Sequence, residues 1–275
     1  MNKLTATVLF LSLTGIALAA EQPVAAQSAD HPGIAAFKAH DYATAFQIWA
    51  PLAEKGDANA QADLGILYLH GLGVNRDAEQ AMQLFHAAAE KGNGQAEFQI
   101  GLMYAKGVGV QQNYGEAMRW YEMAAEQGDG AAGYGIGRLF EEGFGVAQND
   151  KTAASWYRKA AEQGIAPAQF NLSQMIAKGK GGEKKDEVAA FTWCKKAADQ
   201  GFAPAETQIA GMYERGEGVT ANPEQALFWS TVAAKQQEKI AERQRAALVA
   251  KLSPEVVARA QKSASTWKPV LSASK

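Results

Sequence analysis

A pair of glycines two residues apart recurs five times along the chain, at intervals of 36, 36, 36 and 37 residues. The pairs are Gly71 and Gly73, Gly107 and Gly109, Gly143 and Gly145, Gly179 and Gly181, and Gly216 and Gly218. A fixed period in this range is typical of a solenoid, in which each unit buries its apolar face against its neighbours. The one longer interval predicts a single inserted residue in the loop 182–186.

Before each glycine pair, small and apolar residues recur at intervals of three and four, which predicts a helix with one buried face. Four columns, meaning sets of residues at equivalent positions of the five units, form this face. They are Ala60, Ala96, Ala132, Ala168 and Ala205; Leu64, Ile100, Ile136, Leu172 and Ile209; Gly65, Gly101, Gly137, Ser173 and Ala210; and Tyr68, Tyr104, Phe140, Ile176 and Tyr213. The first glycine can end this helix in the left-handed conformation, and the second lets the loop turn sharply.

A second helix is predicted after each pair, because a residue suited to an N-cap stands there every time. These residues are Asp77, Asn113, Asn149, Asp186 and Asn222. The bulky column Leu84, Trp120, Trp156, Trp193 and Trp229 is expected to wedge between units, and glycines at 92, 128, 164 and 201 close the helix. The pattern of this second helix also occurs once earlier, from Asp41 to Gly56.

These residues resemble the Sel-one-like repeat, a relative of the tetratricopeptide repeat. In the first unit the resemblance is carried by Ala60, Gln61, Leu64, Gly65, Tyr68, Gly71, Gly73, Val74, Ala81, Phe85, Ala88, Ala89 and Gly92. It is renewed five times from about Asp41 to Ala234. It implies an all-α fold, a right-handed α-solenoid of stacked antiparallel helix pairs with a C-terminal helical cap. The fourth unit departs most, with Ser173, Ile176 and Cys194.

We divide the chain into a signal peptide (1–19), a flexible leader (20–33), a degenerate helix pair (34–57), five repeats (58–234), capping helices (235–267) and a flexible tail (268–275). The repeats are 58–93, 94–129, 130–165, 166–202 and 203–237. The signal peptide is predicted because Lys3 precedes the apolar stretch Leu4 to Leu18 and a small-x-small cleavage site. We therefore expect export, most simply to the periplasm, with secretion as the alternative and no membrane span in the mature chain.

The C-terminal region has its own pattern and charge. A charged helix is expected over Lys235 to Leu252, with Ile240, Leu248 and Leu252 on its apolar face, and another from Ser253 to Trp267. The region 235–275 carries a net charge of +6, against −9 for residues 20–234. This patch is either the solvated cap that a solenoid needs or a surface for an acidic partner or an anionic surface.

No catalytic, cofactor-binding or metal-binding residue is predicted. The four histidines, His31, His40, His70 and His86, have no spacing that brings two together beside a carboxylate. The glycine pairs lack the lysine and hydroxyl of a phosphate loop, and the net acidity of the repeats disfavours nucleic acid. Two S-x-x-K sequences, at Ser265 and Ser272, stand without companion motifs. The lone Cys194 is interpreted as a core residue.

A partner is expected on the first helix of each pair, on the face that lines the concave surface of tetratricopeptide arrays. The predicted partner-binding residues there are Phe98, Leu102, Lys106, Tyr134, Arg138, Glu142, Phe170, Gln174 and Lys178. Phe98, Tyr134 and Phe170 either form an exposed aromatic floor or fill the seams between neighbouring helices.

The sequence therefore favours a non-catalytic, exported interaction scaffold that binds a protein or peptide of unknown identity in the cell envelope. Two alternatives stay open. One is a β-lactam-interacting or other small-ligand binder; this role is linked to cysteine-rich members of the family, whose cysteine pairs this chain lacks. The other is a peptidoglycan-associated or polysaccharide-associated binder, since exposed aromatic rings also suit carbohydrate.

Overall fold

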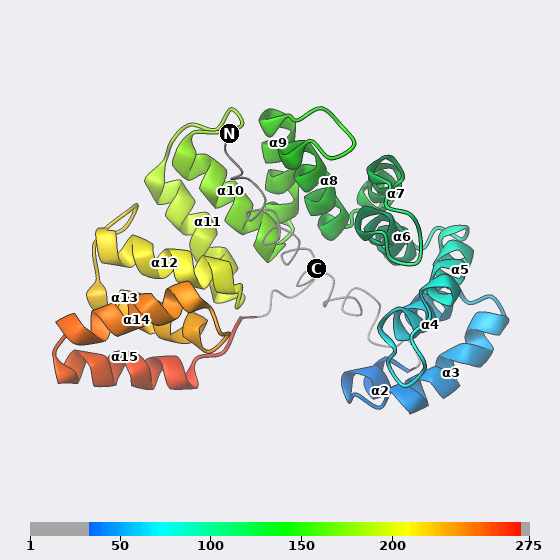
Figure 1. The fold of residues 1–275 in the computed structure, drawn as a ribbon, viewed down its shortest axis with the longest axis horizontal. Helices are drawn as coiled ribbons and strands as arrows, with labels where there is room; N and C mark the ends of the chain where they lie inside the picture. Colours follow the sequence, from blue (N-terminus) through cyan, green and yellow to red (C-terminus); the bar gives the residue numbers. More distant parts are fainter. Residues whose placement is uncertain (1–32, 271–275) are drawn as a thin grey trace, which may run out of the picture. The chain divides into compact units, whose positions relative to one another are not determined.

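The computed structural model describes residues 33–270, and every regular element in that range is a helix (Figure 1). The helices are α2 (Ile34–Lys38), α3 (Tyr42–Glu54), α4 (Ala58–His70), α5 (Ala78–Ala89), α6 (Gly94–Lys106), α7 (Tyr114–Glu126), α8 (Gly130–Glu142), α9 (Asp150–Glu162), α10 (Ala166–Lys178), α11 (Glu187–Asp199), α12 (Ala203–Arg215), α13 (Pro223–Ala234), α14 (Lys239–Lys251) and α15 (Pro254–Thr266). The predicted signal peptide, most of the predicted leader and residues 271–275 lie outside the described residues.

The chain divides between Gln148 and Asn149 into two compact units. In the first, α4 packs against α5 and α6 against α7, each pair as an antiparallel hairpin, and α3 covers α4. In the second, α10 pairs with α11, α12 pairs with α13, and α13 also contacts both α14 and α15 (Figure 1). Within each unit, successive hairpins share continuous apolar clusters of buried side chains.

The predicted caps are present. The side chains of Asp77, Asn113, Asn149, Asp186 and Asn222 each accept a hydrogen bond from a backbone N–H in the first turn of the following helix. The first glycine of each pair adopts the left-handed conformation at the end of α4, α6, α8, α10 or α12, with φ of 65–74°. Local signals in the sequence thus fix where helices start and stop.

The second glycine of each pair has a packing role as well as a turning role. A Cβ added at Gly109 would lie 2.8 Å from the Cβ of Ala78, and one at Gly145 would lie 2.7 Å from the Cβ of Tyr114. Ala78 and Tyr114 begin the second helix of the preceding hairpin. The glycine is therefore needed where one hairpin loop touches the first helical turn of its neighbour.

The predicted wedge column is realised in part. Trp229 is buried, and the half-buried Trp120 packs edge-on against His86 of the preceding unit at a centroid distance of 5.3 Å, whereas Trp156 and Trp193 are also only half-buried. The fully buried column is the next one along: Trp49, Phe85, Tyr121, Tyr157, Cys194 and Ser230. Adjacent residues on a helix point about 100° apart, so the two neighbouring columns differ in how deeply their side chains are buried. Lys159 and Lys196 lie over the rings of Trp156 and Trp193, with the ammonium nitrogens 4.6 and 3.9 Å from the ring centroids.

The C-terminal region differs from its prediction in two respects. Gln237 takes the place of a closing glycine and still adopts a positive φ of 63°, so the chain breaks there and α14 starts at Lys239. Ala241 and Leu248 then face the core, and Ile240 is 61% exposed instead of buried. In α15, Ala260 and Ala264 are buried, and the ring of Trp267 packs edge-on against Trp229.

Candidate binding pocket

In the first unit, most of the predicted partner-binding face is covered. The rings of Phe98 and Tyr134 are 7% and 3% exposed, and Leu102 is buried as well. The Phe98 ring leans against Tyr121 at a centroid distance of 5.8 Å. These two aromatics therefore fill seams, and the exposed aromatic floor is absent from this unit. Lys106 and Glu142 keep exposed surface. The buried Arg138 forms an ion pair with Glu142, with Nη2 3.6 Å from Oε1.

In the second unit, the equivalent face opens. Phe170 is half-buried, with its ring edge-on to Phe202 at 5.5 Å, while Gln174 is half-buried and Lys178 exposed. Whether Lys106, Glu142, Gln174 and Lys178 contact a partner stays a prediction.

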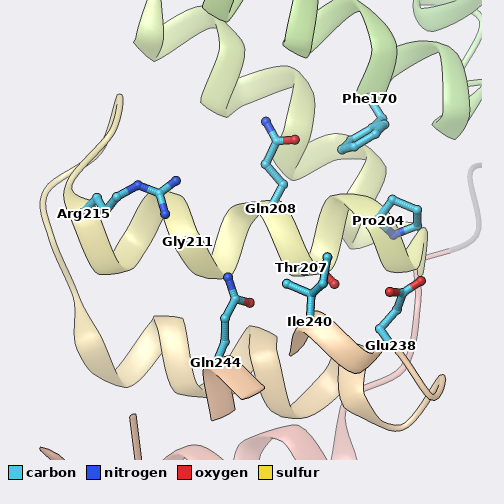
Figure 2. Close-up of a pocket in the computed structure, with 9 residues that line it drawn as sticks. All are labelled: Phe170, Pro204, Thr207, Gln208, Gly211, Arg215, Glu238, Ile240 and Gln244. Atoms are coloured by element: carbon cyan, nitrogen blue, oxygen red, sulfur yellow. The ribbon is translucent and has the colours of Figure 1, made fainter. Parts of the chain in front are cut away.

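A pocket of about 450 Å³ lies between α10, α12 and α14. Figure 2 shows its nine lining residues, which come from those three helices and from the residue that precedes α14: Phe170, Pro204, Thr207, Gln208, Gly211, Arg215, Glu238, Ile240 and Gln244. This volume falls in the range of about 300–1,000 Å³ that is usual for small-ligand sites. Four of the nine, namely Phe170, Thr207, Gly211 and Arg215, occupy the columns that the sequence assigned to the partner-binding face.

Gly211 is what opens this space. The equivalent positions of α6 and α8 carry Leu102 and Arg138, whereas α12 carries no side chain there. The Arg215 side chain folds back over the vacant position, since a Cβ added at Gly211 would lie 2.9 Å from Arg215 Nη1. That neighbour is the tip of a flexible side chain, so the space is adjustable.

The pocket contains hydrogen-bonding groups that the described part of the chain leaves unused. Thr207 is 9% exposed, and its Oγ1 has no partner there; the buried Oε1 of Gln244 has none either. The side chain of Gln208 makes no hydrogen bond to any described residue. Buried polar groups are nearly always paired in folded proteins, so a cluster of unpaired ones marks a place where a ligand or water can bind.

The two ionic groups of the pocket lie at opposite ends of it (Figure 2). Arg215 is already occupied, because its Nε and Nη2 donate to the two carboxylate oxygens of Glu217 at 2.6 and 2.8 Å. That pairing lowers the pKa of Glu217 and raises that of Arg215. The carboxylate of Glu238, by contrast, has no ion pair with a described residue. The uncompensated charge of the pocket is therefore negative.

The nine described residues that line the pocket include no Cys, Ser or His. Cys194 is fully buried, and burial raises the pKa of its thiol to about 12. Ser265 is exposed and donates to the carbonyl of Lys262 at 2.7 Å. Among residues 33–270, no three His, Cys, Asp or Glu side chains are grouped so that they could hold a metal. No helix in the same range is both long and apolar enough to span a membrane.

Sequence reasoning missed Pro204, Gln208, Glu238, Ile240 and Gln244. Periodicity locates the columns within a repeat, but three of these residues stand at the start of α14 or within it. Their approach to α12 is a long-range contact that no repeat signal encodes. One signal in the sequence pointed to this site. Gln208 is a polar residue at the position that the buried polar residues Asp63 and Gln99 occupy in earlier repeats.

The profile of the Sel1 repeat family matches residues 58–93, 94–129, 130–165, 166–202 and 203–238. These segments make up more than half of the chain, which therefore belongs to the Sel1 repeat family. The all-helical structure of stacked helix pairs is the α-solenoid fold of that family. No curated protein gives a significant match to the chain.

Solved structures agree with this assignment. A Sel1 repeat protein from Oxalobacter formigenes is 33% identical, with a TM-score of 0.69; the match covers 86% of this chain and 96% of that one. The c5321 protein of uropathogenic Escherichia coli, described as a protective antigen, is 30% identical with a TM-score of 0.53, over 80% of this chain and 55% of that one. Sel1 repeats generally mediate protein–protein interaction and typically form non-catalytic scaffolds.

Proposed function

We propose that this protein is an exported, non-catalytic adaptor of the cell envelope, and that it holds a segment of a partner protein in the pocket between α10, α12 and α14. The observation that carries the proposal is the opening of the repeat face at Gly211, where Thr207, Gln208 and Gln244 present unused hydrogen-bonding groups. The usual role of Sel1 repeats supports a protein as the partner. The residues of the predicted signal peptide, 1–19, support export.

The pocket is tested by filling it. In Gly211→Leu, the side chain that α6 carries as Leu102 is placed on α12, where it displaces the flexible tip of Arg215. The matched control is Ala246→Leu, which places the same leucine side chain at an exposed position of α14 outside the pocket. Affinity capture from envelope extracts should recover a protein with the wild type and the control, and lose it with Gly211→Leu. Equal capture by all three would contradict the site.

Export is tested separately. Cell fractionation should place the wild-type chain outside the cytoplasm, with its mass reduced by about the mass of the predicted signal peptide. A chain that lacks residues 1–19 should stay in the cytoplasm. Recovery of the unshortened wild-type chain in the cytoplasm would refute export and leave the pocket proposal untouched.

One observation favours a small ligand as a second candidate, namely the pocket volume of about 450 Å³. Thermal shift assays with β-lactams and with muropeptide fragments separate it from the adaptor role. A stabilisation that Gly211→Leu abolishes and Ala246→Leu preserves would favour the small-ligand function.

A further inference from the structure

We infer that the pocket selects a short extended peptide in which an apolar side chain stands beside a lysine or arginine. This inference rests on the proposed adaptor function and names the chemistry of the segment that the pocket takes. It is carried by three features: unused amide-type groups, an exposed apolar rim and an unpaired carboxylate.

The unused groups match a peptide backbone. The Oε1 of Gln244 is an acceptor for a peptide N–H, and the amide of Gln208 offers both a donor and an acceptor. The hydroxyl of Thr207 adds another donor and acceptor. An extended peptide presents N–H and C=O groups in alternation, so it can satisfy donors and acceptors of both kinds along one short stretch.

The apolar rim accounts for one side chain of the peptide. Ile240 lines the pocket with 61% of its surface exposed, although the apolar residues around it in the second unit are mostly buried. The half-buried ring of Phe170 lines the pocket from α10. An aliphatic or aromatic side chain placed between them would remove apolar surface of all three groups from water, which favours binding.

The carboxylate of Glu238 accounts for the basic side chain. Arg215, the cation of the pocket, is paired with Glu217 and offers no net charge to an acidic ligand. Lys235, three residues before Glu238, donates to the carbonyl of Ala264 on α15, so it is engaged elsewhere. Lys239 is exposed and does not line the pocket. A lysine or arginine of the ligand can therefore pair with Glu238 without competition from within the pocket.

The test uses blocked, fluorescently labelled hexapeptides of the sequence Gly-Gly-Leu-Lys-Gly-Gly, with analogues in which lysine becomes glutamine or glutamate, or leucine becomes serine. Fluorescence polarisation gives their affinities for the full chain. We expect the lysine peptide to bind about threefold to fivefold more tightly than the glutamine peptide, with the preference decreasing as salt rises. The glutamate and serine analogues should bind more weakly still.

Two variants decide whether Glu238 makes the selection. In Glu238→Gln the preference for lysine over glutamine should disappear. In Glu242→Gln, which removes an exposed carboxylate of α14 outside the pocket, the preference should persist. Equal melting temperatures show that both variants fold. The inference is overturned if the preference survives Glu238→Gln, if the glutamate peptide binds best, or if the wild type binds none of the peptides at millimolar concentration. An envelope protein lost with Gly211→Leu but kept with Glu238→Gln would leave the proposed function standing and refute this inference alone.

Discussion

The ring of Tyr121 on α7 occupies the space that a side chain at Gly101 on α6 would need. A Cβ built at Gly101 would lie 2.6 Å from Tyr121 Cδ1, and one at Gly135 on α8 would lie 2.9 Å from Tyr121 Cε2 on the other edge of the ring. The same exchange of volume recurs between equivalent positions. In the first repeat, Gly65 faces the large ring of Phe85. In the last two repeats, the glycine is replaced by Ser173 and Ala210, and the ring is replaced by the smaller side chains of Cys194 and Ser230.

Gly101→Ala is expected to destabilise the protein by about 1–3 kcal/mol. The added methyl group clashes with the Tyr121 ring, and the free-energy cost of this overpacking exceeds the gain in helix propensity. Urea denaturation measures the change. Gly115→Ala is the control, since Gly115 is exposed on α7 and its added Cβ meets only Asn113 Oδ1, at 3.3 Å. A loss in the control that equals the loss in Gly101→Ala would show that the ring contact is not the cause.

Glu206 makes the stability depend on pH. It is buried, burial raises its pKa to about 7, and the hydrogen bond from Gln236 and the nearby Lys235 oppose that rise only in part. Because its folded pKa lies above its unfolded value, the stabilisation from protonated Glu206 is present below pH 4.5 and is lost as the pH rises through 7. Glu206→Gln should therefore be more stable than wild type at pH 8.5, by on the order of 3 kcal/mol, and equal at pH 4. Denaturation curves at the two pH values check this, and a constant difference would contradict it.

Cys194 should be inert in the native protein. Its thiol is buried with a pKa raised to about 12, so almost no thiolate is present at pH 8. Within a few minutes, Ellman's reagent should label one thiol per chain in denaturant. Over the same reaction time it should label none in the folded chain. Prompt labelling of the folded chain would mean that α11 opens easily.

Gln237 sits in a conformation that favours glycine, with φ at 63°. Gln237→Gly should stabilise the protein by about 0.5–1 kcal/mol, because glycine adopts this φ without steric cost. The same change at the exposed helical position Glu242 should destabilise it by a similar amount. Thermal unfolding of both variants measures whether each change raises or lowers the stability. A loss of stability at both positions would contradict the explanation given for the break before α14.

The sequence predicted the parts of this fold that are local. The N-cap at Asn113 and the left-handed glycine at Gly107 depend on neighbours within a few residues, and both are confirmed. Burial depends on the angle at which a side chain leaves its helix, and a shift of one residue exchanged Trp120 for Tyr121 in the core.

The candidate site was predicted only in part for a related reason. The columns that contain Thr207 and Gly211 follow from periodicity alone. The cover supplied by α14 does not, because Glu238, Ile240 and Gln244 belong to no repeat. The helix break at Gln237 also rotates Ile240 from its predicted buried face to the rim of the pocket.

Photocrosslinking in living cells shows directly whether a partner contacts the pocket between α10, α12 and α14. Ile240 on the rim and Val188 on α11 are nearly equally exposed, at 61% and 63%, and only Ile240 lines the pocket. Each is replaced in turn by p-benzoylphenylalanine, and the cells are irradiated. We expect a crosslinked product of discrete mass from position 240 and none from position 188. A product from position 188 alone, or from neither position, would contradict this expectation.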